Sequence, residues 1–193
     1  MFISGGGTGL QSIIDAAKAG ILSARVALVV SSTKKAFGLE RAARENIEAF
    51  VFRQKDYESP EAAAADLLAR LRERHIDYIA LAGYLKLLPA QIVRAYPRRI
   101  LNIHPALLPK YGGPGMYGHF VHEAVLASGD KETGPSVHLV DEIFDHGKIL
   151  AQVRIPVRPD DTPETLQARV QAEEHKLYPR VIEQLIKGKY EID

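Results

Sequence analysis

Apolar residues in the first half of the chain fall in short runs that alternate with segments of helical spacing. Four of these runs, at 25–31, 49–52, 78–82 and 100–103, are almost continuously apolar, and Phe2-Ile3-Ser4 is a shorter one. Strands of a parallel sheet have this composition, because helices cover both of its faces. We therefore predict strands at all five places.

Helices are predicted between these strands. Residues 10–19, 37–45 and 60–74 have helical spacing, with Ser59 as the N-cap of the third helix and Pro60 in its first turn. Strands that alternate with helices in this way predict an α/β protein with a mostly parallel sheet and helices on both faces.

The pattern changes after residue 109. Residues 110–118 contain four glycines and a proline, which predicts a long loop. A short helix is expected at 119–128. Two further strands, at 136–140 and 149–155, are expected to pair antiparallel and to form a C-terminal extension of the sheet.

The last predicted helix begins at Thr162. Thr162 is the expected N-cap and Pro163 the first helical residue. Pro179 lacks an N–H donor, so we expect it to kink or break this helix.

Composition limits the possible functions. The 193 residues carry 25 basic and 24 acidic side chains and no cysteine. The balanced charge argues against nucleic acid as a partner, and the lack of thiols excludes disulfides and thiolate zinc sites. No apolar run is long enough to span a bilayer and no signal peptide precedes the first strand. We expect one cytoplasmic domain that binds small molecules, as a monomer or homodimer.

The first candidate site is the glycine-rich segment Ser4–Gly9, between the first strand and the first helix. Glycines let backbone N–H groups approach an anion, and the helix N-terminus adds its positive end. The spacing matches neither the dinucleotide fingerprint nor the Walker A loop. Phosphate is favoured over a plain tight turn.

The second candidate site combines Asn102, His104 and Asp145. Asn102 and His104 are two residues apart on a strand, so they share a face, and an amide beside an imidazole suits the polarisation of a carbonyl. Asp145 lies in a loop after a later strand; if it reaches His104, its charge would raise the pKa of the imidazole. The alternatives are a structural histidine and an aspartate that only caps its turn.

Two further polar groups have simpler interpretations. His119 and His122 lie one helical turn apart, as a metal pair would, but no third ligand is evident, so a solvated face is predicted and no metal is expected. The run of Gln171, Glu173, Glu174 and His175 is predicted to be a solvated helix face.

These segments, taken in order, resemble the folate-dependent formyltransferases, and among them the branch that acts on glycinamide ribonucleotide. The matching segments are Ile3–Gln11, Phe37–Ala42, Leu81–Tyr84, Asn102–Pro105, Leu107–Tyr111, Gly134–His138, Asp145–Gly147 and Arg169–His175. The resemblance runs from Ile3 to about Tyr178. It implies a Rossmann-like half, residues 1–103, and a second half, residues 104–193, that completes a cleft within a single formyltransferase domain.

The resemblance also implies roles for individual residues. Asn102, His104 and Asp145 match the catalytic positions. The substrate contacts would be Gly7, Thr8 and Gly9 for the ribosyl phosphate and Gln171 and Glu174 for the glycinamide; the folate contacts would be Leu85, Lys86, Leu87, Leu88, Asn102 and Val140. The implied reaction moves the formyl group of 10-formyltetrahydrofolate to the glycinamide amine in purine biosynthesis, with Asn102 and protonated His104 as donors to the oxyanion.

Three alternatives to this reaction remain. A formyltetrahydrofolate hydrolase normally has an additional N-terminal domain, and a methionyl-tRNA formyltransferase has a basic C-terminal barrel. Neither is expected in 193 residues of balanced charge. A catalytically silent folate- or nucleotide-binding protein would not need Asn102, His104 and Asp145 together.

Overall fold

The computed structural model describes residues 1–191, which form one seven-stranded sheet and one two-stranded sheet. The larger sheet has the strand order β3-β2-β1-β4-β5-β7-β8. Its strands are β1 (Phe2–Ile3), β2 (Leu28–Ser31), β3 (Glu48–Val51), β4 (Ile79–Ala82), β5 (Ile100–His104), β7 (Ser136–Leu139) and β8 (Ile149–Gln152). β1 to β5 are parallel, whereas β7 and β8 are antiparallel to their neighbours. The predicted fold class, a mostly parallel α/β sheet with an antiparallel extension, is confirmed.

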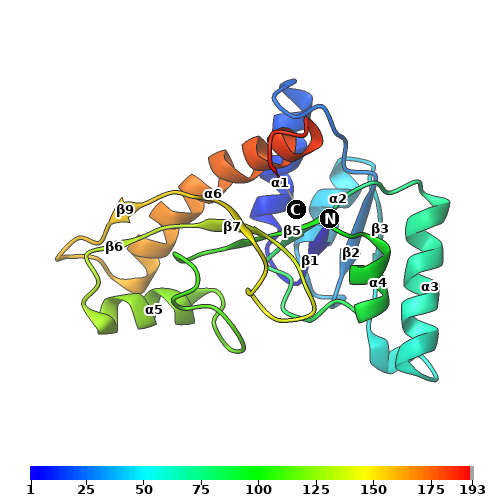
Figure 1. The fold of residues 1–193 in the computed structure, drawn as a ribbon, viewed down its shortest axis with the longest axis horizontal. Helices are drawn as coiled ribbons and strands as arrows, with labels where there is room; N and C mark the ends of the chain where they lie inside the picture. Colours follow the sequence, from blue (N-terminus) through cyan, green and yellow to red (C-terminus); the bar gives the residue numbers. More distant parts are fainter. Residues whose placement is uncertain (192–193) are drawn as a thin grey trace.

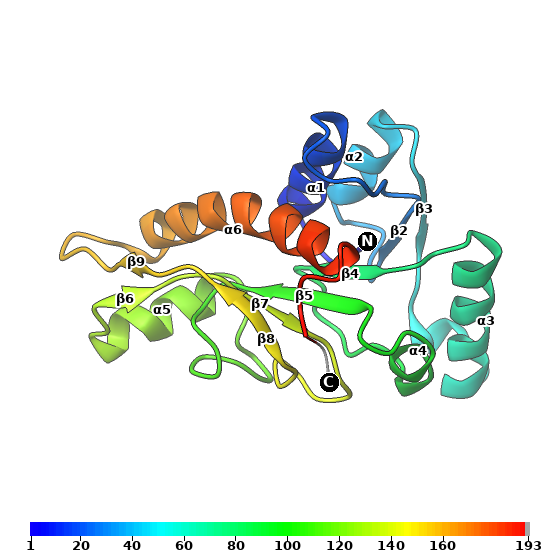
Figure 2. The same ribbon diagram turned by 45° about the horizontal axis from the view of Figure 1, so that its top comes forward.

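Helices cover both faces of this sheet (Figures 1 and 2). The helices are α1 (Thr8–Lys18), α2 (Gly38–Arg44), α3 (Pro60–Glu73), α4 (Ala90–Ala95), α5 (His119–Ser128) and α6 (Pro163–Ile186), with a 3-10 turn at Gln54–Asp56. α1, α2 and α6 lie on one face and α3 and α4 on the other, while α5 packs against the N-terminal part of α6. The small sheet of β6 (Glu132–Thr133) and β9 (Ile155–Pro156) also lies beside the N-terminal part of α6.

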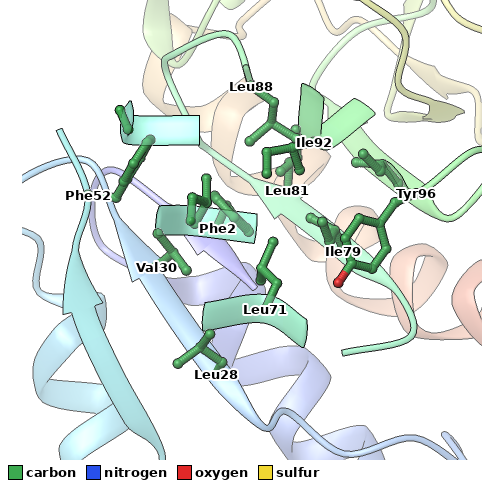
Figure 3. Packing of buried hydrophobic residues seen from close by; sticks show 13 residues of the cluster. Phe2, Leu28, Val30, Phe52, Leu71, Ile79, Leu81, Leu88, Ile92 and Tyr96 are labelled. Carbon is green, nitrogen blue, oxygen red and sulfur yellow. The ribbon is translucent and has the colours of Figure 1, made fainter. Parts of the chain in front are cut away.

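Each face of the sheet has its own apolar core. Figure 3 shows the core beneath α3 and α4, where Phe2 and Ile79 of the sheet lie with Leu71 and Ile92 of the helices, all 1% exposed or less. Complete burial of a large apolar side chain stabilises the fold by about 1.5–3 kcal/mol. On the other face, α1 and α6 pack against Ala80 of β4 and Leu101 of β5. The cores on the two faces together fix the carboxyl ends of β1, β4 and β5 relative to one another.

The predicted elements of the parallel half are all present, with ends that differ by at most three residues. Ser59 caps α3 by accepting a hydrogen bond from the Ala62 N–H at 3.0 Å, and Thr162 caps α6 together with Thr165. Of the kink or break expected at Pro179, the break is wrong, because α6 continues to Ile186, and the kink stays a prediction. Pro179 is buried, and the packing of α6 against α1 and the sheet outweighs the loss of one backbone hydrogen bond.

Sequence reasoning missed α4, the 3-10 turn and the two short strands β6 and β9. The strand expected at 149–155 is two strands in different sheets: β8 pairs with β7, whereas β9 pairs with β6. The division of the domain at residues 103 and 104 stays a prediction. Within residues 1–191, no helix combines the length and the apolar content needed to cross a membrane.

Candidate active site

A cleft of about 600 Å³ opens at the carboxyl ends of the parallel strands, where ligands of open α/β sheets bind. Every site residue expected from the sequence lines it. These residues are Gly7, Thr8, Gly9, Leu85, Lys86, Leu87, Leu88, Asn102, His104, Val140, Asp145, Gln171 and Glu174. The glycine loop and the middle of α6, far apart in sequence, therefore face the same space as the end of β5.

Asn102, His104 and Asp145 meet on one side of this cleft. The Nδ1 atom of His104 lies 3.5 Å from Oδ2 of Asp145, and the side-chain amide of Asn102 donates to Oδ1 of Asp145 at 3.2 Å. Asp145 has φ = 52°, a left-handed conformation that aspartate tolerates better than most residues. The contact between His104 and Asp145, which the sequence left open, is present.

His138 is a fourth member of this cluster that sequence reasoning did not single out. It lies opposite Asn102 in the antiparallel pairing of β5 with β7, and its Nε2 atom is 3.0 Å from Nδ2 of Asn102. Its Nδ1 atom donates to the Leu139 carbonyl at 2.8 Å, which fixes the ring. The strand alternation of Ser136, His138 and Val140 is the signal that could have placed His138 on the Asn102 face.

The charges in this cluster depend on burial. Burial lowers the pKa of His104 below its ordinary value, although Asp145 and the Tyr111 carbonyl act in the opposite direction. Burial also acts to raise the pKa of Asp145, but His138, His104 and the Gly113 N–H outweigh it and keep that pKa low. The effect expected of Asp145 is thus present, but desolvation exceeds it, so the protonated His104 implied by the resemblance is not favoured. Near pH 7 the structure favours a neutral imidazole beside a charged Asp145.

The glycine loop leads directly into α1. Gly7 occupies the N-cap position of α1 with φ = 69° and no side-chain cap, so the first N–H groups of the helix are left for a ligand. Arg41 of α2 supports the loop from behind: its Nε donates to the Gly6 carbonyl at 2.9 Å and its Nη1 to the Gln11 side chain at 3.3 Å. Arg41 brings positive charge to an anion site, and sequence reasoning assigned it no role although it lies in the Phe37–Ala42 segment.

Replacing Gly7 with alanine is expected to lower the free energy of unfolding by about 1–3 kcal/mol. A Cβ atom at Gly7 would lie 2.6 Å from Cα of Gly38, and the backbone is left-handed. Thermal unfolding measures the loss. Gly6→Ala is the matched control, because its Cβ would meet no atom within 4 Å. Equal melting temperatures for the two variants would show that the close approach to α2 does not constrain the loop.

One face of α6 forms the wall of the cleft next to the glycine loop. Gln171 donates from Nε2 to the Thr8 hydroxyl at 2.9 Å, which ties α6 to the start of α1. Burial raises the pKa of Glu174 to about 7. One turn further, the buried hydroxyl of Tyr178 lies between the carbonyls of Leu81 on β4 and Leu101 on β5, at 2.9 and 3.0 Å. Of the run predicted to be a solvated helix face, Gln171, Glu174 and His175 instead line the cleft, whereas Glu173 does not.

The segment expected to contact folate follows β4 and forms the other rim. The side chains of Leu85 and Leu87 are 43% and 45% exposed, whereas Leu88 is buried in the core under α4. Exposed leucines beside a cleft offer apolar surface to a flat ligand. Val140 lines the cleft from the end of β7.

The solvated face predicted for α5 is wrong at one of its two histidines. His119 is exposed, but His122 is 1% exposed, and its Nδ1 atom has no hydrogen-bond partner. Burial, with smaller effects of His104 and His119, lowers the pKa of His122 to about 4, so this ring is neutral. Within the described residues 1–191, no three histidine, aspartate or glutamate side chains are grouped as a metal site requires.

Comparison with known proteins agrees with this geometry. Residues 1–182 match the family described as formyl transferase. The chain is 45% identical over 185 residues to the chloroplastic phosphoribosylglycinamide formyltransferase of Vigna unguiculata, covering 96% of this chain and 59% of that protein. It is 39% identical over 189 residues to the phosphoribosylglycinamide formyltransferase of Escherichia coli, covering 98% and 87%. The chain thus spans only about three fifths of the plant relatives.

Solved structures give the same result. The glycinamide ribonucleotide transformylase 1 of Geobacillus kaustophilus superposes with a TM-score of 0.87 at 46% identity, covering 95% of each chain. The homologous structure from Symbiobacterium toebii has a TM-score of 0.92 at 40% identity, covering all of this chain and 88% of the other. With a family match over residues 1–182 and relatives of this similarity over almost its whole length, the chain belongs to the formyl transferase family.

Proposed function

We propose that this protein transfers the formyl group of 10-formyltetrahydrofolate to the amine of glycinamide ribonucleotide, in purine biosynthesis. The observation that carries this proposal is that one cleft is lined by the His104–Asp145 pair, by Glu174 and by the glycine loop at the N-terminus of α1. The named activities of the relatives support the same reaction. We further propose a cytoplasmic monomer or homodimer.

The acceptor is assigned to the glycine loop and α6. Its phosphate would accept hydrogen bonds from the backbone N–H groups of Gly7, Thr8 and Gly9 at the N-terminus of α1, with Arg41 behind them. Its amine would reach Glu174, whose carboxylate attracts an ammonium group. Gln171, already bonded to Thr8, would contact the glycinamide part.

The formyl donor is assigned to the opposite rim. The leucines of the Leu85–Leu88 segment and Val140 would contact the folate ring system, with Lys86 near its charged tail. This arrangement presents the formyl carbon between His104 and Glu174. The residues present fit the donor, because the rim supplies apolar surface and backbone polar groups together.

In this proposal His104 first accepts a proton from the amine and then donates it to the leaving folate nitrogen. The acceptor amine is an ammonium ion near pH 7 and must lose a proton before it can attack. Neutral His104 takes up a proton at Nδ1, and Asp145 stabilises the resulting charge. A bond then forms between the amine nitrogen and the formyl carbon, and the attacking nitrogen releases its second proton to solvent. The bond from the formyl carbon to the folate nitrogen breaks, and His104 donates its proton to that leaving nitrogen.

Asn102 is proposed as the donor to the formyl oxygen as negative charge develops on it. Its amide nitrogen bonds Asp145 and lies 3.0 Å from Nε2 of His138. To serve the oxyanion, Asn102 exchanges one of these contacts for the formyl oxygen. A single donor of this kind contributes about 10²–10³ in rate.

The decisive experiment is a spectrophotometric assay with a 10-formyl folate, run with glycinamide ribonucleotide, with glycinamide alone, and with no amine. We expect turnover with the ribonucleotide only. Turnover that does not depend on any amine would instead identify a hydrolase. Folate binding without turnover would identify a catalytically silent binding protein.

A further inference from the structure

The backbone of Tyr111 holds the imidazole of His104. The carbonyl oxygen of Tyr111 lies 2.7 Å from Nε2 of His104. A carbonyl can only accept a hydrogen bond, so Nε2 must carry the hydrogen. Tyr111 presents this carbonyl from a left-handed conformation with φ = 60°, which a non-glycine residue adopts only where its surroundings enforce it.

The same loop holds Asp145. The backbone N–H of Gly113, two residues after Tyr111, donates to Oδ2 of Asp145 at 3.0 Å. One oxygen of Asp145 thus faces both Gly113 and Nδ1 of His104. Because Nε2 is committed to the backbone, Nδ1 is the nitrogen of His104 that can gain and lose a proton.

The side chain of Tyr111 is fixed outside the cleft. Its hydroxyl donates to Oδ2 of Asp130 at 2.7 Å and also contacts the Ser128 hydroxyl at the end of α5. Lys110 binds both oxygens of Asp130 at 2.7 Å and lies over the Tyr111 ring, 4.9 Å from its centroid. The Tyr111 ring also packs against the small core that includes Val125. These contacts enforce the strained backbone of Tyr111 from the far side of the loop.

We propose that Tyr111 is a positioning residue that commits His104 to one tautomer, and that Asp130, which does not line the cleft, holds Tyr111 in place for this task. This inference rests on the function proposed above for the role of His104, but the geometry of the ring can be tested without it. Without this contact neutral His104 would be divided between two tautomers, and only the one with hydrogen on Nε2 leaves Nδ1 able to take up a proton beside Asp145.

The test is Tyr111→Phe, which removes the hydroxyl and keeps the ring. Nitrogen NMR of histidine-labelled protein, with the His104 signals assigned by the loss of peaks in His104→Gln, reports the tautomer and the pKa of the ring. The wild type should show hydrogen on Nε2 in the neutral form. In Tyr111→Phe the other tautomer should become populated and the pKa of His104 should fall, because the Tyr111 carbonyl raises it.

The ionisable groups that face His104 are Asp145 from its loop, His138 from β7 and His122 from α5. All three are left unchanged by the substitution, so a shift in the titration of His104 reports the carbonyl contact. In the formyl-transfer assay we expect kcat to fall about tenfold with KM unchanged, as for a misplaced catalytic group.

Tyr57→Phe is the matched control. Tyr57 also donates to an aspartate, Asp66 at 2.6 Å, which is likewise paired with a basic side chain, Arg70, but it lies beside α3 and away from the cleft. It should leave the His104 signals and kcat unchanged. If Tyr111→Phe matches the wild type in tautomer and pKa, the proposal is overturned.

Asp130 provides a second pair of variants in case Tyr111→Phe does not fold. Asp130→Asn keeps an acceptor for the Tyr111 hydroxyl and should retain the His104 tautomer, whereas Asp130→Ala should lose it. Equal spectra for these two variants would contradict the proposal. Failure of the proposed function would appear differently, as a wild type with the predicted tautomer but no amine-dependent formyl transfer.

Discussion

Replacing His104 with alanine is expected to lower kcat by about 10³, within the range of a positioned general acid or base. The KM values for both substrates should stay within a few-fold, because His104 is 3% exposed and offers little surface for binding. Steady-state kinetics with each substrate varied in turn measures both quantities.

A second His104 variant separates chemistry from packing. His104→Ala leaves a small cavity and an unpaired Tyr111 carbonyl, so part of its loss could come from a disturbed loop. His104→Gln can still donate to that carbonyl but cannot take up a proton near pH 7. We expect the same loss of kcat in both variants. If His104→Gln retains more than about a tenth of the wild-type kcat, His104 is not the acid–base group.

Replacing Glu174 with glutamine is expected to weaken activity and to stabilise the fold. Removing one partner of a buried pair of carboxylate and ammonium costs about 3–4 kcal/mol. We therefore expect kcat/KM for the ribonucleotide to fall by about 10²–10³. The KM for the folate should not change, because Glu174 lies on α6 and not in the Leu85–Leu88 segment that is proposed to contact the folate.

The effect on stability follows from the pKa of Glu174, about 7 in the folded protein against an ordinary value of 4.5. Below pH 4.5 the carboxyl is protonated in both states and costs nothing. As pH rises from 4.5 to 7 the unfolded state loses the proton first, so the wild type loses stability, by about 1–3 kcal/mol in total. Glu174→Gln removes that cost and should raise the melting temperature above pH 7 but not below pH 4.5.

Glu173→Gln is the control for this stability effect. Glu173 is the neighbouring acid, paired with Lys176 at 2.8 Å, and does not line the cleft. Its substitution should not reproduce the pH-dependent gain. A Glu174→Gln protein that melts like the wild type at pH 8 would show that the carboxylate is solvated when charged.

The parallel half of the fold could be predicted from the sequence because burial on both faces leaves a local signal. The apolar runs that became β2, β4 and β5 each form that signal within a few residues. α4 has only six residues, fewer than two helical turns, so it is too short to show a period and was missed. The two-residue strands β6 and β9 exist only through their pairing with each other, which leaves no local pattern.

The candidate site was predictable where it depends on side chains of one element. Asn102 and His104 share a face by strand alternation alone. The contact of Asp145 with His104 depends instead on how β7 returns to β5, and the burial of His122 depends on what packs over α5. The Tyr111 contact uses a backbone carbonyl, which any residue carries, so no residue type could have revealed it.

Tyr178 gives the cleft a fixed length. Its hydroxyl bonds carbonyls of β4 and β5 one helical turn beyond Glu174, while β5 itself ends at His104. The separation between the Glu174 carboxyl group and the His104 imidazole is thus set by a helix that is hydrogen-bonded to the sheet. In the proposed reaction the reach of the acceptor from phosphate to amine would be matched to this fixed spacing, so a redesign for a longer acceptor would begin at Tyr178.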